Sequence, residues 1–301
     1  MDNDIKVIKY IKETIKKTKF KLDYKDINIM DESTGNEYIK KLILGSNPCA
    51  VVRGGATEMR CISEYLAKNG FSNKIKEEIH NLSGVFPADN QTLDRFCRHY
   101  IECISQADLI SLWGVGAESK VIHKYCKDSR FTKLHALEPY YFSNPWSRVL
   151  EDKKVLIIHP FIETVMHQYE HRDEIWPTTH IIPKFKDLIC IKAVQSIAGQ
   201  KTEFESWFKA LQSMEEQIHA ADFDVAIIGA GAYGLPLALY CKKEGKKAIQ
   251  MSGATQILFG IKGKRWDMHP VISSYYNEAW VRPNLLETPK DNEKVEGGSY
   301  W

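Results

Sequence analysis

Short, continuously apolar runs alternate along the chain with segments whose apolar residues recur at helical spacing. Runs of this kind are typical of strands buried on both faces of a parallel sheet. Seven runs predict strands: Cys49–Arg53, Asp108–Trp113, Leu134–Leu137, Val155–His159, Leu188–Ala193, Asp224–Gly229 and Lys247–Met251. The segments that predict helices include Thr57–Lys68, Gln91–Gln106, Phe161–Arg172, Glu203–Ala220 and Leu235–Glu244. This alternation predicts an α/β fold with an open, mostly parallel sheet and helices on both faces.

The N-terminal segment has a different pattern. Over residues 4–18, Ile5, Ile8, Ile11 and Ile15 recur at helical spacing, and lysines fill the opposite face. A basic amphipathic helix can lie on a membrane surface, but this apolar face has no Trp or Phe to insert. We favour a helix that packs on the body of the protein, and peripheral membrane contact stays open.

Three regions follow from these patterns. Residues 1–45 are expected to form an N-terminal helical extension, and residues 46–270 the α/β domain. Residues 271–301, where the apolar pattern fades, are expected to form a tail that wraps the surface. Residues 139–145 begin and end in proline, and they mark a waist that could divide the domain into two lobes.

Composition and charge narrow the class of protein. Hydrophobic residues make up 44% and charged residues 27% of the 301 positions, as in ordinary globular chains. The 41 Lys and Arg residues nearly balance the 39 Asp and Glu residues, which argues against a protein that coats nucleic acid. The seven cysteines are scattered without a C-x-x-C pair, and the sequence shows no signal peptide or membrane-spanning run. We therefore expect a reduced, cytoplasmic protein without a transmembrane segment.

A glycine turn follows the predicted strand Asp224–Gly229. The run Gly229-Ala230-Gly231-Ala232-Tyr233-Gly234 has the G-x-G-x-x-G spacing of a dinucleotide-binding turn, where backbone N–H groups approach a phosphate at a helix N-terminus. Such sites need an acid at the end of the following strand to bind a ribose, and Ile249–Ser252 contains none. A dinucleotide oxidoreductase is therefore disfavoured. A phosphate cradle and a turn that needs glycine only for packing both stay open.

Positive charge gathers around this turn. Between Lys242 and Arg265 there are seven basic residues and one acid. The lysines of the predicted helix and its exit fit a solvated face, whereas Lys262, Lys264 and Arg265 lie among glycines near the expected cleft. Lysine binds phosphate as a point charge and arginine as a bidentate fork. We expect these three side chains to contact phosphate.

A second corner follows the first predicted strand. Arg53 and Glu58 bracket two glycines in the run R-G-G-A-T-E, although an acid in a first helical turn also simply complements the helix dipole. His159 ends another predicted strand, so it could face the same cleft as an acid or base.

The helix expected after His159 carries a polar stripe. Glu163, His167 and His171 repeat at four-residue spacing, and the outer two are about 12 Å apart along a helix. All three cannot bind one metal ion, so we favour a surface stripe, with Glu163 kept as a second candidate acid or base.

Taken together, these corners resemble a known family. The run at Arg53–Glu58 resembles the R-x-G-D-G-E signature of the GT-D type of glycosyltransferases. The run from Gly231 to Trp266 and the ending V-E-G-G-S-Y-W are similar to uncharacterised proteins encoded among bacterial surface or capsular polysaccharide genes. The resemblance covers about residues 46–301. It implies a Rossmann-like fold and an enzyme that moves a sugar from a nucleotide-sugar donor to a glycan acceptor.

The resemblance also bears on whether the site binds a metal ion. The Asp and Glu of the family signature engage a metal and the donor diphosphate, and here Ala56 stands at the Asp position while Glu58 is kept. A Mn²⁺ or Mg²⁺ ion thereby loses one hard oxygen ligand. Glu118 or Glu163 could replace that carboxylate, or cations could neutralise the diphosphate without a metal.

The leading hypothesis is a glycosyltransferase of surface polysaccharide biosynthesis that uses a nucleotide-diphosphate sugar. The expected substrate-binding residues are Arg53, Gly55, Gly229, Gly231, Tyr233, Gly234, Lys262, Lys264 and Arg265, and the expected catalytic residues are Glu58, Glu163 and His159. The alternative is a catalytically silent nucleotide- or glycan-binding subunit that partners a true transferase, which Ala56 motivates. Nucleic acid is not an expected partner.

Overall fold

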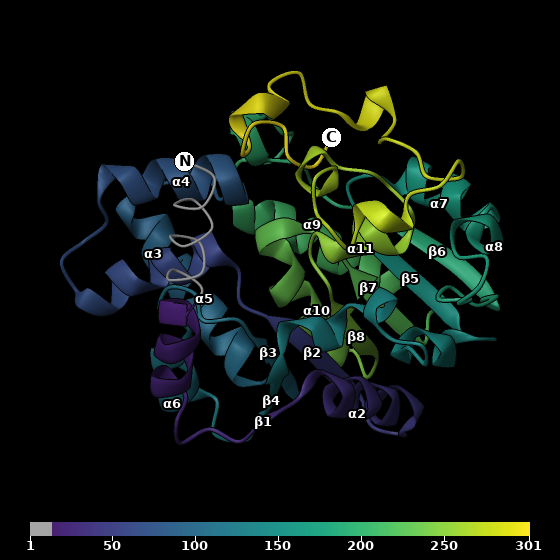
Figure 1. Cartoon of the computed structure of the whole chain (residues 1–301). Helices are drawn as coiled ribbons and strands as arrows, with labels where there is room; N and C mark the ends of the chain where they lie inside the picture. Colours follow the sequence, from purple (N-terminus) through teal and green to yellow (C-terminus); the bar gives the residue numbers. More distant parts are fainter. Residues whose placement is uncertain (1–13) are drawn as a thin grey trace, which may run out of the picture.

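The computed structural model describes residues 14–301, and one sheet of eight strands forms the centre of this part of the chain (Figure 1). The strands are β1 (Ile29–Met30), β2 (Cys49–Arg53), β3 (Leu109–Leu112), β4 (Arg130–Lys133), β5 (Lys154–His159), β6 (Asp187–Lys192), β7 (Val225–Ile228) and β8 (Lys247–Gln250). Their order across the sheet is β1-β4-β3-β2-β8-β7-β5-β6, and every neighbouring pair is parallel. The predicted α/β class with an open parallel sheet is confirmed.

Helices cover both faces of this sheet. They are α2 (Glu32–Leu44), α3 (Ala56–Ala67), α4 (Asn73–Ser83), α5 (Asn90–Ser105), α6 (Glu118–Tyr125), α7 (Ile162–Glu170), α8 (Arg172–Ile175), α9 (Trp207–Ala220), α10 (Gly234–Lys243) and α11 (Ala254–Leu258), and residues 14–23 are helical as well. One face packs mainly on α3, α5, α9 and α10, and the other on α2, α7, α8 and α11. Successive strand residues point to opposite faces, so Val52 and Ile158 join the first core while Val51 and Ile157 join the second.

Six of the seven predicted strands are confirmed, with ends that move by at most one residue. The strand predicted at Leu134–Leu137 is wrong, because these residues form a 3-10 turn. The strand of this region is the preceding β4, in which Arg130 and Lys133 are exposed and only the two residues between them are buried. So short a buried stretch leaves no continuous apolar run, and β4 therefore escaped detection.

The predicted helices agree with the structure except at two places. Three of them match α3, α5 and α10 within one residue at each end. The helix predicted over Phe161–Arg172 is interrupted at His171, where α7 ends and α8 begins. The helix predicted from Glu203 begins only at Trp207, because the Ser206 hydroxyl caps it by accepting a hydrogen bond from the Lys209 N–H at 3.3 Å.

Helix α2 lies inside the helical extension expected over residues 1–45, but the sequence did not predict its bounds, and its polar residues explain why. Gly35 lies so close to β4 that a Cβ there would be 2.1 Å from the Thr132 hydroxyl oxygen. Asn36 is buried, and its side-chain oxygen accepts a hydrogen bond from the Trp146 N–H at 2.7 Å. A glycine and an asparagine thus occupy contact positions where a periodicity argument expects apolar side chains.

The path of the chain through the sheet determines where a ligand can bind. From β2 the chain moves outward through β3 to β4, then crosses to β5 and β6 at the far side, and β7 and β8 fill the space between. All of these strands end at the same edge because the sheet is parallel. In such folds the crevice for a ligand lies outside the carboxyl ends, where the strand order changes direction.

The C-terminal segment, yellow in Figure 1, returns to the body of the protein at its end. The N–H groups of Lys264 and Arg265 donate hydrogen bonds of 3.1 Å each to the carbonyls of Trp301 and Ser299. The last residues are thereby attached to the loop that follows α11.

The three regions predicted from the sequence stay a prediction, although β1, inside the expected extension, belongs to the central sheet. Ile5, Ile8 and Ile11 lie outside the described residues, and Ile15 is 62% exposed. Within residues 14–301, no helix has both the length and the apolar character needed to span a bilayer.

The core of the sheet gives a prediction about stability. Ile157 in β5 is fully buried, so Ile157→Ala should lower the free energy of unfolding by about 2–5 kcal/mol. Leu285 is 88% exposed, so Leu285→Ala should change it by less than about 0.5 kcal/mol. Urea denaturation measures both, and a loss below about 1 kcal/mol for Ile157→Ala would contradict the two-sided core.

Candidate functional site

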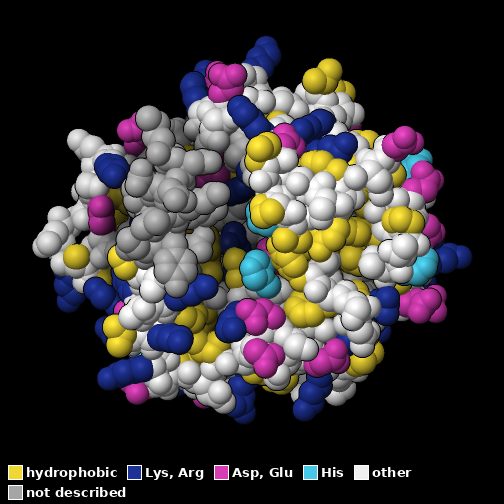
Figure 2. All heavy atoms as spheres, viewed as in Figure 1, with side chains coloured by type: hydrophobic (Ala, Val, Ile, Leu, Met, Phe, Trp, Pro, Cys, Tyr) yellow, Lys and Arg dark blue, Asp and Glu magenta, His cyan; other side chains and the backbone are white. Residues whose placement is uncertain are grey.

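One cleft of about 330 Å³ lies at the carboxyl edge of the sheet. Residues at the ends of β2 to β8 line it, and residues 295–301 contribute part of its wall. Figure 2 shows a hollow near the middle of the molecule in this view, with Lys, Arg and His side chains at its edge and hydrophobic side chains beside it. The cleft is large enough for a small organic ligand.

Arg53 occupies the end of β2, at the floor of the cleft. Its guanidinium carbon lies 4.8 Å from the centroid of the Trp113 ring, and its Nε is buried without a hydrogen-bond partner among the described residues. A buried donor without a partner is costly. The guanidinium is therefore held by stacking and keeps hydrogen-bonding capacity for an anionic ligand.

The two glycines after Arg53 allow the next side chains to converge. A Cβ at Gly55 would lie 1.9 Å from a carboxylate oxygen of Glu58, and a Cβ at Gly54 would lie 2.6 Å from the Met59 methyl group. Glu58, in the first turn of α3, is only 7% exposed and lines the cleft. The structure thus brings Arg53, Gly55 and Glu58 together as the sequence predicted.

Tyr100 of α5 joins this corner without any signal in the sequence. Its hydroxyl oxygen accepts a hydrogen bond from the Gly55 N–H at 3.1 Å. Burial first, and the negative charge of Glu58 second, raise the pKa of the Tyr100 hydroxyl far above its usual value. The hydroxyl therefore stays protonated next to Glu58.

His159 ends β5 and lines the cleft, as expected. Its Nδ1 accepts a hydrogen bond from the Phe161 N–H at 3.0 Å, so the neutral ring carries its proton on Nε2. Burial lowers the pKa of His159 to about 3. At neutral pH this imidazole is uncharged and is a hydrogen-bond donor rather than an effective general base.

The glycine turn after β7 serves both packing and the cleft. A Cβ at Gly229 would be 2.6 Å from the His159 ring, so this glycine is required for packing. Gly231 has a φ of +53° and open space around it, and it lines the cleft. Gly234 does not line the cleft and instead lies close to Gln250, while Tyr233 lines it with a ring stacked on Trp207 at 4.9 Å.

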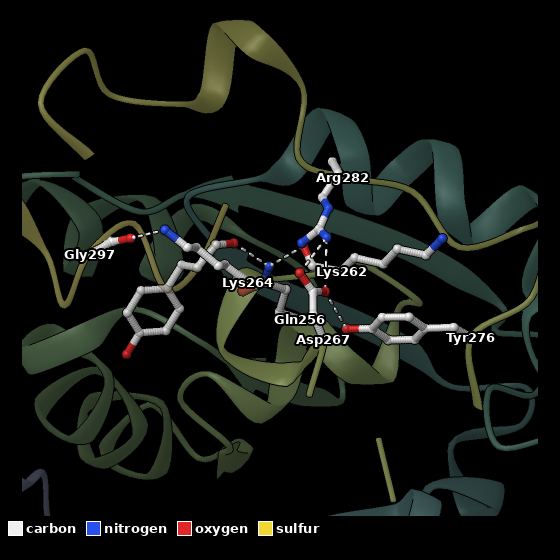
Figure 3. Close-up of polar contacts among 8 residues, drawn as sticks. Gln256, Lys262, Lys264, Asp267, Tyr276, Arg282 and Gly297 are labelled. Carbon is white, nitrogen blue, oxygen red and sulfur yellow. Dashed lines mark hydrogen bonds and ion pairs between the residues drawn. The ribbon is translucent and has the colours of Figure 1, made fainter. Parts of the chain in front are cut away.

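The structure separates the three cations that the sequence placed together. Lys262 and Lys264 point in opposite directions, and neither lines the cleft (Figure 3). The Lys262 ammonium lies 5.3 Å from the Tyr276 ring centroid, and the Lys264 ammonium donates a hydrogen bond of 3.1 Å to the Gly297 carbonyl. Arg265 alone of the three lines the cleft, where it pairs with Glu296 at 3.3 Å.

The structure does not bring the acidic candidates outside the corner into the cleft. Glu163 is exposed in the first turn of α7, and Glu118 is fully buried at the start of α6 behind Gly54. His167 and His171 stack on one another at 4.6 Å on the exposed side of α7. Across residues 14–301, no three His, Cys, Asp or Glu side chains are grouped closely enough to hold a metal ion.

Several residues at or just after strand ends were not among the expected site residues, although they line the cleft. Gln250 ends β8, where its side-chain oxygen accepts a hydrogen bond from the Arg53 N–H at 2.8 Å and its amide nitrogen donates to the Ser252 hydroxyl at 2.6 Å. Ser252 has a φ of +53° and lines the cleft. Arg53 and His159 were chosen because they lie at the ends of predicted strands. The same criterion would also have found Trp113, Gln250 and Ser252.

An aromatic wall closes the cleft on the side of the C-terminal segment. Trp266, Tyr300 and Trp301 line it, and the Arg265 guanidinium carbon lies 4.8 Å from the Tyr300 ring centroid. A Cβ at Gly253 would lie 3.2 Å from the Tyr300 ring, so the absence of a side chain there leaves room for this ring. Rings of this kind can stack on a base or a sugar.

The buried imidazole gives a prediction about pH. His159 has a folded pKa below its unfolded value, so only the unfolded chain takes up this proton and stability falls as pH drops from about 6.5 toward about 3. Between pH 7 and pH 5 the wild-type protein should lose about 2 kcal/mol more than His159→Gln. Urea denaturation at both values checks this difference, and an equal loss in both proteins would refute a buried neutral His159.

Comparison with known proteins adds a likeness in fold. No protein-family model matches the chain, and no curated protein does either. Among solved structures, a glycosyltransferase (DUF1792) from Streptococcus sanguinis is 12% identical over 76% of this chain and 82% of its own, with a TM-score of 0.46. A selenomethionine-substituted domain of unknown function 1792 is 12% identical over 78% of this chain and 82% of its own, with a TM-score of 0.41. Both TM-scores lie below 0.5, so these two structures give this chain neither an activity nor a role for any residue.

Proposed function

We propose that this protein is a glycosyltransferase that binds a nucleotide-diphosphate sugar at the carboxyl edge of its sheet and transfers the sugar to a glycan of bacterial surface polysaccharide. The observation that carries the proposal is the Arg53 guanidinium, which lines the cleft and stacks on the Trp113 ring. An arginine fork matches the oxygens of a diphosphate. The surface polysaccharide and the donor class come from the sequence resemblance.

Glu58 supports the transfer step. In this step the oxygen of an acceptor hydroxyl forms a bond to the anomeric carbon of the donor sugar, and the bond from that carbon to the diphosphate oxygen breaks. The proton of the hydroxyl passes to the Glu58 carboxylate, which lines the cleft, and the negative charge of the leaving diphosphate develops beside Arg53. Acid–base and electrostatic catalysis are thus assigned to the two ends of one glycine turn.

His159 and Gly231 complete the donor site. The neutral His159 ring can donate a hydrogen bond from its Nε2–H, so it orients the nucleotide sugar, and Glu58 acts as the base. Gly231 has no side chain and open space, and a phosphate or ribose can approach its backbone closely. Arg265 and Tyr300 close the opposite side of the cleft.

The residues present do not make a metal site of their own. Ala56 contributes no ligand, and the other acids of the lining are engaged elsewhere: Glu296 pairs with Arg265, and Glu138 pairs with His135. Glu58 is a single carboxylate, whereas Mg²⁺ and Mn²⁺ sites are built from several oxygen ligands. The proposed step therefore assigns charge neutralisation to Arg53.

The alternative of a silent binding subunit rests on the same residue, Ala56, and would use the same cleft without turnover. A dinucleotide oxidoreductase has less support. Gln250, at the position where an acid would bind the ribose, uses both ends of its side chain to connect β2 with the loop after β8.

Two substitutions separate binding from turnover. Arg53→Gln should weaken calorimetric binding of the tightest ligand among UDP, GDP, dTDP and their sugars by about tenfold or more, because a charge-assisted contact to diphosphate is lost. Glu58→Gln should leave that affinity within about threefold and lower donor turnover on the order of 10²–10⁴-fold, as loss of a general base does.

The matched control is Arg98→Gln, which removes an arginine from the exposed Arg98–Asp94 pair of α5 and should alter neither quantity. Absence of binding by every nucleotide in the wild-type protein would refute the proposal. Binding without turnover in the wild type, unchanged in Glu58→Gln, would favour the silent subunit.

A further inference from the structure

Glu118 is a fully buried carboxylate that lies behind the Arg53 corner and does not line the cleft. Its Oε2 accepts three hydrogen bonds, from the Tyr24 hydroxyl at 2.6 Å and from the N–H groups of Trp113 and Gly114 at 3.1 and 2.8 Å. Its Oε1 is buried and has no partner among the described residues. A carboxylate so placed is costly, and no part of the proposed chemistry uses it directly.

The loop that Glu118 holds leads to Arg53. Trp113, whose N–H the carboxylate binds, donates its indole Nε1–H to the Gly54 carbonyl at 2.8 Å. The same indole ring lies 4.8 Å from the Arg53 guanidinium carbon. The position of the ring therefore depends on the backbone that Glu118 fixes, and the guanidinium rests on the ring.

The same loop also touches the helix that carries Glu58. Gly116 has a φ of +47°, and a Cβ there would lie 2.4 Å from the Met59 carbonyl carbon. The Ala117 N–H donates a hydrogen bond of 3.0 Å to the Met59 carbonyl. The loop from Trp113 to Glu118 thus packs against both ends of the Arg53–Glu58 turn.

A segment before the sheet holds Glu118 from the other side. Tyr24 is buried and donates to the carboxylate, while the Ser119 hydroxyl donates to the Asp23 carbonyl at 2.8 Å. A Cβ at Gly114 would lie 3.1 Å from the Phe20 ring. Residues 20–24 therefore cover the loop and exclude water from Glu118.

From this chain of contacts we infer that Glu118 is a positioning residue for the diphosphate-binding corner, acting through Trp113 on Arg53. The inference rests on the proposed function for the identity of the ligand. One carboxylate oxygen accepts from two successive backbone N–H groups and a hydroxyl at once, although burial raises the pKa of the Glu118 carboxyl above its ordinary value. The side-chain amide oxygen of a glutamine is a weaker hydrogen-bond acceptor than a carboxylate oxygen that three donors share.

The test combines a spectroscopic and a binding measurement on the full chain. The Trp113 indole N–H resonance is assigned by its loss in Trp113→Phe. In Glu118→Gln it should shift while the Trp176 indole, which donates to the Leu258 carbonyl on the other side of the sheet, stays in place. Calorimetric affinity for inorganic pyrophosphate should fall about tenfold in Glu118→Gln and about threefold in Tyr24→Phe, which removes one of the three donors.

Glu64→Gln is the matched control, because Glu64 also holds a loop by accepting from the Ser72 N–H and hydroxyl, but away from the cleft. It should change neither the Trp113 resonance nor pyrophosphate binding. An unmoved Trp113 resonance with pyrophosphate affinity within twofold of wild type in both Glu118→Gln and Tyr24→Phe would overturn the inference.

Displacement of every indole resonance in Glu118→Gln, with Tyr24→Phe like the wild type, would also overturn it, since the carboxylate would then support the whole fold. If the wild type binds neither pyrophosphate nor any nucleotide while the Trp113 resonance alone moves, the proposed function fails and the positioning of Trp113 stands.

Discussion

The parallel direction of all eight strands is the constraint on which the rest of the structure depends. Parallel pairing sends every connection across a face of the sheet, so both faces are covered and the residues of β2, β3, β5, β7 and β8 are almost all buried. It also brings every carboxyl end to one edge. Residues far apart in the sequence, such as Arg53, His159 and Gln250, therefore line a single cleft.

Glycines determine how closely side chains approach one another at that edge. Gly55 lets the Glu58 carboxylate lie against the turn that follows Arg53, and Gly229 lets the His159 ring pack against the end of β7. A Cβ at Gly229 would also lie 2.9 Å from the Ser252 backbone oxygen, which cannot turn aside, whereas at Gly55 only the end of the flexible Glu58 side chain would have to move. Close packing at the rim thus explains why polar side chains converge there, and the resulting burial explains the low pKa of His159 and the unpartnered Arg53 Nε.

Much of the fold and part of the site could be predicted from the sequence. Apolar runs predicted six strands, five of which are almost wholly buried and therefore apolar along nearly their whole length. Arg53 and His159, which end strands, and Gly229, which follows one, line the cleft, and their roles there stay a prediction. The strand β4 was not predicted because only two of its residues are buried.

The rest depends on contacts that sequence spacing does not encode. Lys262 and Lys264 lie in the expected loop, but their side chains bind Tyr276 and the Gly297 carbonyl, which come from the C-terminal segment. Tyr100 reaches the cleft from the middle of a helix, and Tyr300 reaches it from a tail without periodicity. Glu118 comes soon after β3, but its carboxylate lies behind Gly54 and outside the cleft, because the Trp113 and Gly114 N–H groups bind it there.

The account is tested most directly by a crystal structure of the protein soaked with the nucleotide-diphosphate sugar that binds it best. It predicts the diphosphate beside the Arg53 guanidinium, within hydrogen-bonding distance of the part of it that lines the cleft. The nucleotide should lie inside the cleft, with Gly231 and His159 at its side. A nucleotide bound outside the cleft, or one whose diphosphate lies at the Gly229–Gly234 turn and leaves Arg53 without a contact, would contradict it.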